Sequence, residues 1–167
     1  RYAEEETKSY AREGSGGRGG EGRTAAQTEA VGRALESDGG GETHIEPPRS
    51  VVGQDNRLSA PDLAGGRIAG IRAAGCDVLD VGEVPTPTLY WSEVTFETDA
   101  SVQITGSHNP PEWNGIKMTF ARASLYGDAI QGLHRRISDG DMDAGQGSDE
   151  TLQPLAQYCD DVAGRFC

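Results

Sequence analysis

Residues 100–117 read A-S-V-Q-I-T-G-S-H-N-P-P-E-W-N-G-I-K and form the most informative segment of the chain. Val102 and Ile104 alternate with polar residues, which predicts a strand over residues 100–105. A loop follows at once, because Gly106 lets the backbone turn sharply and lets a ligand approach closely. We therefore expect a strand whose end opens directly into a polar loop.

Strands and helices alternate on both sides of this segment. Ser59 is a good helix N-cap and Pro61 suits a first turn, so we expect a helix that begins there and ends at Gly75. The other expected elements are strands at 51–53, 76–82 and 116–120 and helices at 24–35, 88–96, 127–137 and 152–166. This alternation predicts an α/β sandwich. Sites in such folds lie at the carboxyl ends of strands, so the loops after residues 53 and 105 are candidate sites.

The composition limits the classes of function that the chain can have. Its 167 residues suit one ordinary domain or one domain plus a fragment, and its net charge is −12 with a pI of about 4.6. Non-specific nucleic-acid binding needs a basic face, which this balance argues against, and no apolar run approaches the length of a membrane span. The first residues are polar and charged, so we expect no secretory signal. Cys76, Cys159 and Cys167 have no metal-type spacing, so we expect reduced thiols in a cytoplasmic protein.

The loop after residue 105 concentrates groups that suit nucleophilic or phosphate chemistry. It holds the Ser107 hydroxyl, the His108 imidazole, two asparagine amides and Lys117 within a short span. It is not a G-x-S-x-G elbow, because Asn109 stands where the second glycine should be. It is not a Walker A loop either, because the spacing differs and no Gly-Lys-Ser/Thr follows. On residue types alone, a loop without chemistry is an equal alternative.

The full amino-acid sequence of the loop distinguishes between these alternatives. Residues 105–117, T-G-S-H-N-P-P-E-W-N-G-I-K, resemble the active-site serine signature of the α-D-phosphohexomutase family, and are most similar to its phosphomannomutase/phosphoglucomutase branch. Residues 51–59 resemble that family's V-V-G-R-D-x-R-L-S segment, and residues 84–90 resemble its V-P-T-P-x-L-Y segment. The resemblance covers roughly residues 24–167.

The resemblance implies a fold and a division into domains. We expect a three-layer α/β/α sandwich with a mixed sheet, the family's domain I, over residues 24–150. Residues 151–167 are expected to begin a second domain that is cut off, so the chain is expected to be a fragment. The Gly-rich residues 1–23 have no apolar periodicity, and we expect them to be flexible and to stay outside the core.

The resemblance also implies an activity. Family members are isomerases that interconvert hexose 1-phosphate and hexose 6-phosphate through a phosphoserine and a bisphosphorylated sugar. The implied cofactor is Mg²⁺, with most of its ligands in the missing second domain, and the implied activator is a hexose 1,6-bisphosphate. The expected partner is a small phosphosugar. The reaction is mainly positioning and charge neutralisation, which a few placed cations can supply.

The family pattern assigns roles to five residues. Ser107 is expected to carry the phosphoryl group and, through it, to bind the metal. His108 would orient or protonate reacting oxygens, with a structural histidine as the alternative. Lys117 would place a cation near the phosphoryl group, with a solvated lysine as the alternative. Asn109 and Arg57 are expected to form the substrate-binding part; Asn109 would also hold the loop, and Arg57 has an ion pair with Asp55 as its alternative.

Residues 139–143, D-G-D-M-D, resemble the family's magnesium loop and half-fit a calcium loop, but Ala144 follows where both patterns require another residue. We interpret them as a solvated acidic turn. Three other functions remain open at this point: a phosphoglucosamine mutase, a non-catalytic phosphosugar-binding module and, more weakly, a calcium-binding protein.

Overall fold

The computed structural model describes residues 15–18 and 47–166. The strands are β1 Ser15–Arg18, β2 Arg49–Gln54, β3 Asp77–Glu83, β4 Ala100–Ile104, β5 Trp113–Phe120, β6 Ala123–Ser124 and β7 Asp149–Thr151. The helices are α3 Ala60–Ala73, α4 Thr86–Thr95, α5 Asp128–Asp139 and α6 Leu155–Gly164. The helix expected at residues 24–35 lies outside the described residues.

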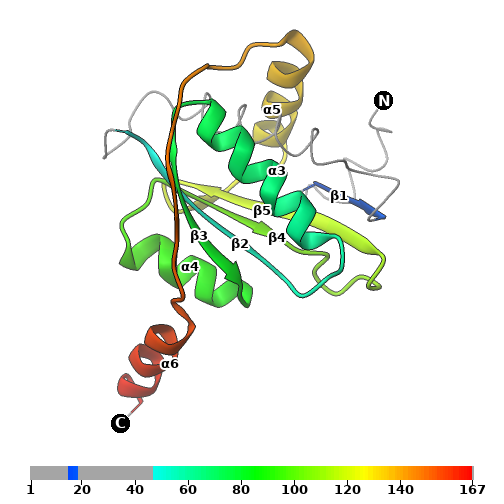
Figure 1. Ribbon diagram of the computed structural model, residues 1–167. Coiled ribbons are helices and arrows are strands. Elements are labelled where there is room, and N and C mark those ends of the chain that lie inside the picture. The colour runs from blue at the N-terminus through cyan, green and yellow to red at the C-terminus, as the bar shows by residue number, and fades with distance from the viewer. Residues whose placement is uncertain (1–14, 19–46, 167) are drawn as a thin grey trace.

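The strands form one mixed sheet in the order β1-β5-β4-β2-β3-β7, with β6 paired to β5 (Figure 1). Strands β4, β2, β3 and β7 run parallel to one another, whereas β5 is antiparallel to β4 and β1 is antiparallel to β5. The central strand β2 is buried on both faces, as strands of parallel sheets are when helices cover each side. The expected mixed sheet is confirmed.

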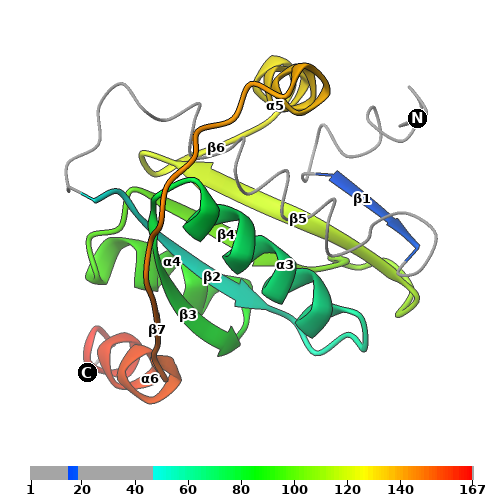
Figure 2. The same ribbon diagram turned by 45° about the horizontal axis from the view of Figure 1, so that its top comes forward.

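Helices cover both faces of this sheet (Figure 2). Val52 points to the face that α3 covers, where it packs in one apolar cluster with Leu63 of α3 and Leu133 of α5. Val51 points to the other face and packs with Leu89 of α4. Successive side chains of a strand alternate between faces, so two adjacent valines serve two separate cores. The three-layer α/β/α sandwich is thereby confirmed.

Strand β1 corrects one expectation. Ser15–Arg18 lies in the Gly-rich segment that we expected to be flexible, but it pairs with Trp113–Ile116 at the outer edge of β5. A strand edge carries unpaired N–H and C=O groups, and glycines can supply backbone partners without any side-chain pattern. Apolar periodicity therefore gave no sign of this strand.

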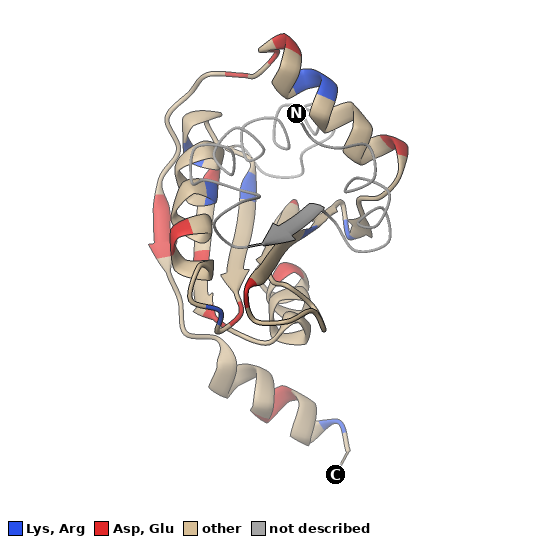
Figure 3. Ribbon diagram, turned by 90° about the vertical axis from the view of Figure 1, so that its right-hand side faces the viewer, with Lys and Arg blue, Asp and Glu red and all other residues tan. Residues whose placement is uncertain are grey.

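Strand β7 differs from the expectation in a similar way. We expected no strand between the helices at 127–137 and 152–166, yet Asp149–Thr151 pairs with β3 as a wholly exposed acidic strand. It spans the point at which we expected a second domain to begin, and that division stays a prediction. Figure 3 shows acidic residues on β7 and at both ends of α5.

Helix α6 extends from the sandwich near α4 and buries none of its side chains (Figure 1). The Trp91 indole N–H of α4 donates to Asp161 Oδ2 of α6 over 2.8 Å, and the Trp91 ring meets Tyr158 edge to face. Within residues 15–18 and 47–166, no helix combines the length and the apolar character needed to cross a membrane.

Candidate active site

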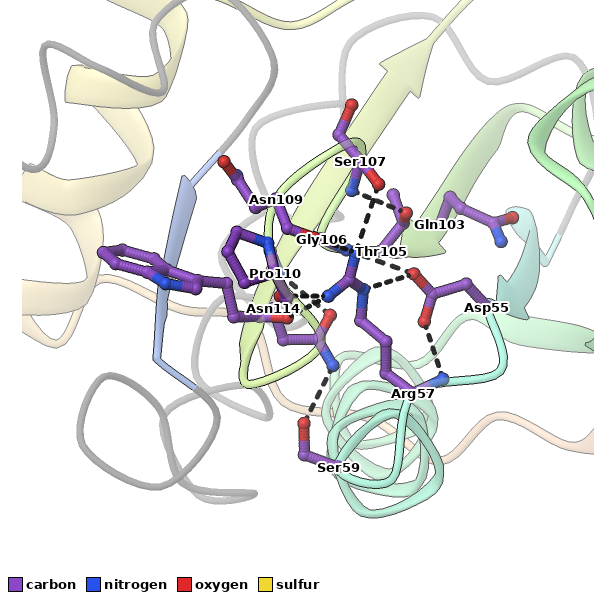
Figure 4. A network of polar contacts seen from close by, with 12 residues as sticks. Asp55, Arg57, Ser59, Gln103, Thr105, Gly106, Ser107, Asn109, Pro110 and Asn114 are labelled. Carbon is purple, nitrogen blue, oxygen red and sulfur yellow. Dashed lines mark hydrogen bonds and ion pairs between the residues drawn. The ribbon is translucent and has the colours of Figure 1, made fainter.

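Two loops meet at the carboxyl ends of the neighbouring parallel strands β2 and β4. We call residues 55–59 the β2 loop and residues 105–112 the serine loop. The Asp55 N–H donates to the Ile104 carbonyl over 2.8 Å, and the Gly106 N–H donates to Asp55 Oδ2 over 3.2 Å. The two loops that the sequence identified as candidate sites are thus joined by hydrogen bonds (Figure 4).

Ser107 has a backbone conformation that is unusual for a residue with a side chain. Its φ is +53°, in the left-handed region, which costs a non-glycine residue roughly 1–2 kcal/mol. Its N–H donates to Thr105 Oγ1 over 3.0 Å, so the side chain of a neighbour supports the turn. The next turn of the loop is closed by the Asn109 N–H, which donates to the Gly106 carbonyl over 3.0 Å.

The side chain of Arg57 holds the serine loop in place through hydrogen bonds. Its Nε donates to Asp55 Oδ2 over 2.9 Å, and only 10% of its side chain is exposed. Its two terminal nitrogens donate to backbone carbonyls of the serine loop and of β5. These carbonyls belong to Pro110 and Trp113, which contact Nη1, and to Ser107 and Asn109, which contact Nη2.

A guanidinium has five N–H groups, and these contacts use all of them. In this arrangement Arg57 has no donor left for a phosphate. The geometry therefore supports the alternative that the sequence left open, an ion pair with Asp55, and extends it to a contact with the whole loop. A substrate-binding role for Arg57 remains a prediction.

Gly106 leaves the space that Arg57 occupies. A Cβ at this position would lie 2.4 Å from Arg57 Cζ and 2.7 Å from the Trp113 carbonyl oxygen. Both distances are far below van der Waals contact. Any larger residue would therefore have to displace the guanidinium or the loop.

Asn114, near the start of β5, and Ser59 of the β2 loop form a second link, which sequence reasoning missed. The buried Asn114 donates its side-chain N–H to Ser59 Oγ over 3.1 Å and accepts the Gly115 N–H at Oδ1 over 2.9 Å. Ser59 is the N-cap residue of α3 as expected, but its hydroxyl makes no capping bond. The Trp113-Asn114-Gly115 sequence, which is part of the family signature, could have pointed to Asn114.

The remaining predicted site residues follow Ser107 along the chain. His108 and Asn109 follow it on the exposed tip of the loop. Lys117 lies on β5 opposite Gln103 of β4, two residues beyond Gly115, whose carbonyl accepts the Thr105 N–H. The described contacts include no hydrogen bond between the Ser107 hydroxyl and either His108 or Lys117, so proximity here rests on chain position.

The acidic turn at residues 139–143 has an ordinary structural role. Gly140 adopts a left-handed conformation (φ +69°) and ends α5, and Asp141 lies 3.6 Å from Arg136. Across the described ranges, no three His, Cys, Asp or Glu side chains come together in a way that could hold a metal ion.

Comparison with known proteins gives a consistent result. A family model described as phosphoglucomutase/phosphomannomutase, alpha/beta/alpha domain I, matches residues 13–142, a range that includes β1. The phosphomannomutase/phosphoglucomutase of Pseudomonas aeruginosa is 42% identical over 146 residues, which are 84% of this chain and 30% of that protein. A probable phosphoglucosamine mutase of Methanopyrus kandleri is 39% identical over 136 residues, which are 81% of this chain and 29% of that protein.

A solved structure supports the same grouping. A phosphoglucomutase/phosphomannomutase family protein from Burkholderia thailandensis superposes with a TM-score of 0.81 at 39% sequence identity. The match covers 90% of this chain and 34% of that one. The chain thus spans about a third of the length of the proteins that it resembles.

Proposed function

Because this chain belongs to the phosphoglucomutase/phosphomannomutase family and contains its α/β/α domain I, we propose that it is the phosphoserine-bearing part of a phosphohexomutase. Such an isomerase interconverts the 1-phosphate and the 6-phosphate of a hexose, here glucose or mannose. The proposed partner is accordingly a small phosphosugar. The observation that carries this proposal is the fixed, half-buried position of Ser107 at the carboxyl end of β4.

The proposed reaction consists of two transfers. In the first, the bond between the phosphorus and Ser107 Oγ breaks as a hydroxyl oxygen of the hexose monophosphate bonds to the phosphorus. The hydroxyl proton leaves to a base, and Ser107 Oγ regains a proton. After the bisphosphorylated sugar turns around, its other phosphate returns to Ser107 by the reverse steps, and the net product is the isomeric monophosphate.

We assign His108 and Lys117 to this chemistry. His108 adjoins Ser107 on the exposed tip of the loop, where an imidazole can exchange a proton with a reacting oxygen. Lys117 extends from the strand beside the loop, where an ammonium can offset the charge of the transferring phosphoryl group. We assign Asn109 to substrate binding, because Arg57 holds its backbone carbonyl and so keeps this residue beside the serine in the loop.

Magnesium, which the family uses, has no complete site among the described residues. A phosphate on Ser107 would supply one ligand oxygen, and further ligands would have to come from elsewhere. We also propose a cytoplasmic location, which the free thiol of Cys159 supports.

The proposal is tested by measuring phosphoryl transfer to the protein in the form in which the natural organism produces it. Incubation with glucose 1,6-bisphosphate should add one phosphoryl group to the intact protein, and peptide mass spectrometry should place it on Ser107. Ser107→Ala should take up none, while Ser138→Ala, a change at an exposed serine of α5, should behave as the wild type does. Equal labelling of wild type and Ser107→Ala would instead indicate a module that does not use this serine.

Substrate choice needs a separate measurement. The similarity to a probable phosphoglucosamine mutase makes glucosamine 1-phosphate the informative competitor. We expect kcat/KM for glucose 1-phosphate and mannose 1-phosphate to exceed that for glucosamine 1-phosphate. The reverse order would replace the proposed substrate and leave the phosphoserine chemistry in place.

A further inference from the structure

The serine loop has a conformational cost that some interaction must offset. Ser107 lies in the left-handed region at φ +53°, and the Pro110 and Pro111 rings leave the loop two fewer backbone donors with which to close on itself. Strained backbone persists only where its surroundings determine it. The question is which contact fixes this conformation.

Arg57 is the contact that reaches the largest part of the loop. Its terminal nitrogens bind four carbonyls spread from residue 107 to residue 113, at distances that include 2.9 Å to Asn109 and 3.1 Å to Ser107. Four carbonyl oxygens can converge only if the chain curls around the guanidinium. The loop shape and the place of Arg57 therefore determine each other.

Asp55 fixes the guanidinium in turn. One carboxylate oxygen accepts Arg57 Nε and the Gly106 N–H, and the other accepts the Arg57 backbone N–H over 3.2 Å. The carboxylate also balances the charge of a side chain that is nine-tenths buried. The Asp55–Arg57 pair thus links the start of the β2 loop to the serine loop, through Asp55 at Gly106 and through Arg57 as far as Trp113.

This arrangement orients the groups around the serine. Its carbonyl faces the guanidinium, whereas its hydroxyl points away from Arg57 (Figure 4). In a planar trans peptide the N–H is opposed to the C=O, so the His108 N–H is also directed away from Arg57. A phosphoryl group on Ser107 would therefore lie on the side of the loop that Arg57 does not occupy.

We propose that the Asp55–Arg57 pair is a positioning device that sets the rate of phosphoryl transfer at Ser107 and does not bind the sugar phosphate. The proposal rests on the phosphohexomutase function proposed above. Lysine cannot replace Arg57 in this role, because an ammonium has three donors and no planar fork to span four carbonyls. Gly106 belongs to the same device, because a Cβ there would overlap the guanidinium.

The experiment compares Arg57→Met, Arg57→Lys and Gly106→Ala with Arg72→Met as the matched control. Arg72 also joins an ion pair and a loop carbonyl, at the far end of α3. Misplacing a reacting group can cost about 100-fold in rate, so Arg57→Met and Gly106→Ala should lower kcat by about that factor, with KM changed less than about threefold. Arg57→Lys should lose about tenfold, because it keeps the charge but not the fork. Arg72→Met should retain the wild-type kcat.

Amide hydrogen exchange provides a readout that does not depend on activity. In Arg57→Met, and to a smaller degree in Arg57→Lys, the Asn109 and Trp113 N–H groups should exchange at least about tenfold faster than in the wild type, because their bonds to Gly106 and Pro110 depend on the loop shape. Arg72→Met should leave these rates unchanged. A wild-type protein that accepts no phosphoryl group would end the proposed function, while the exchange result would still decide whether Arg57 orders the loop.

Two results would overturn the positioning role. A higher KM with unchanged kcat in Arg57→Met would mean that Arg57 binds substrate, as the sequence first indicated. Unchanged loop exchange would mean that other contacts hold the turn. If Arg57→Met does not fold, Arg57→Lys decides instead, and wild-type kcat and exchange in that variant would reject the proposal.

Discussion

The serine loop and the segment that precedes β7 are both short polar segments that adjoin the sheet, but different interactions hold them in place. The first is held by a side chain, the guanidinium of Arg57 from a neighbouring loop. The second, residues 140–148, which we call the β7 loop, is held mainly by its own backbone. The Gly145 and Gly147 N–H groups donate to carbonyls at the end of α3 over 2.8 and 2.9 Å.

The β7 loop thereby satisfies carbonyls that every helix end leaves without an intrahelical partner. The contact is so close that a Cβ on Gly147 would lie 1.9 Å from the Cys76 carbonyl oxygen. At the serine loop, by contrast, the nearest atoms to a Cβ on Gly106 belong to the Arg57 side chain, which can move. The β7 loop is therefore fixed against backbone that cannot rotate away, whereas the serine loop has a conformation that one side chain can release.

The largest stability effect is expected at the β7 loop. Gly147→Ala should lower the free energy of unfolding by about 3 kcal/mol, because the new methyl group meets backbone that cannot rotate away. Gly65→Ala is the control: its Cβ meets nothing within 4 Å in the exposed face of α3, and it should raise stability by about 0.5–1 kcal/mol. Urea denaturation measures both.

Phosphoryl transfer then separates the two loops. The folded fraction of Gly147→Ala should label Ser107 at the wild-type rate, whereas Gly106→Ala should be slow even when it is fully folded. Slow transfer in folded Gly147→Ala would show that the loops are coupled and would remove the contrast between them.

An intermediate effect is expected from two ion pairs. The Asp55–Arg57 pair has side chains 22% and 10% exposed, while the Arg72–Asp149 pair beside the β7 loop has side chains 43% and 42% exposed. Double-mutant cycles to alanine should give a coupling energy of about 2 kcal/mol for the first pair, because its hydrogen bonds are charged and shielded from water. The second should give less than about 1 kcal/mol. Equal coupling energies would mean that burial does not distinguish the pairs.

The sequence predicted the regular part of this fold well, for physical reasons that particular residues show. Val51 and Val52, Val102 and Ile104 have the apolar pattern of strands, and the Ser59-to-Gly75 span has helix start and stop signals, so β2, β4 and α3 were placed within a few residues. Strands β1 and β7 were missed, because glycines and acidic residues pair through backbone alone.

The candidate site was predicted in its parts but not in its connections. The alternation of strands and helices placed Ser107 and Arg57 in two candidate loops, and the family resemblance implied a substrate-binding role for Arg57. No local pattern shows that carbonyls fifty or more residues away take up its donors. Ser59 is similar, since its hydroxyl bonds to Asn114 across the fold instead of capping its own helix. The roles of Ser107, His108, Lys117 and Asn109 stay predictions until transfer is measured.

The smallest effect tests the polar contact at the end of the β7 loop. The pKa of Asp77 lies below its ordinary value because the Ser148 backbone N–H donates to its carboxylate, with the Ser148 hydroxyl adding a second bond. A carboxyl whose pKa is lower in the folded state stabilises the fold above its unfolded pKa, and this contribution is lost as the pH falls through the folded pKa. Ser148→Ala removes only the hydroxyl bond, so it should raise the Asp77 pKa part of the way toward its ordinary value. At about pH 7 it should cost at most about 1 kcal/mol, because water screens this exposed contact.

That cost should shrink toward zero as the pH is lowered from about 7 to below the folded-state pKa of Asp77, where the carboxyl is protonated in both proteins. Ser138→Ala provides the matched control, because the Ser138 hydroxyl donates to the His134 carbonyl, which does not titrate, so its cost should be the same at both pH values. Denaturant titrations of the three proteins across this range measure the difference. If the cost of Ser148→Ala is independent of pH, the Ser148 hydroxyl contributes nothing through Asp77, and the β7 loop is held by its backbone groups and by the Arg72 contact to the Gly147 carbonyl. If the cost depends on pH, the Ser148 hydroxyl is one more side-chain contact that holds the β7 loop. The two loops would then differ mainly in the carboxylate that accepts their hydrogen bonds, because the Asp77 contacts are exposed and the Asp55 contacts are partly buried.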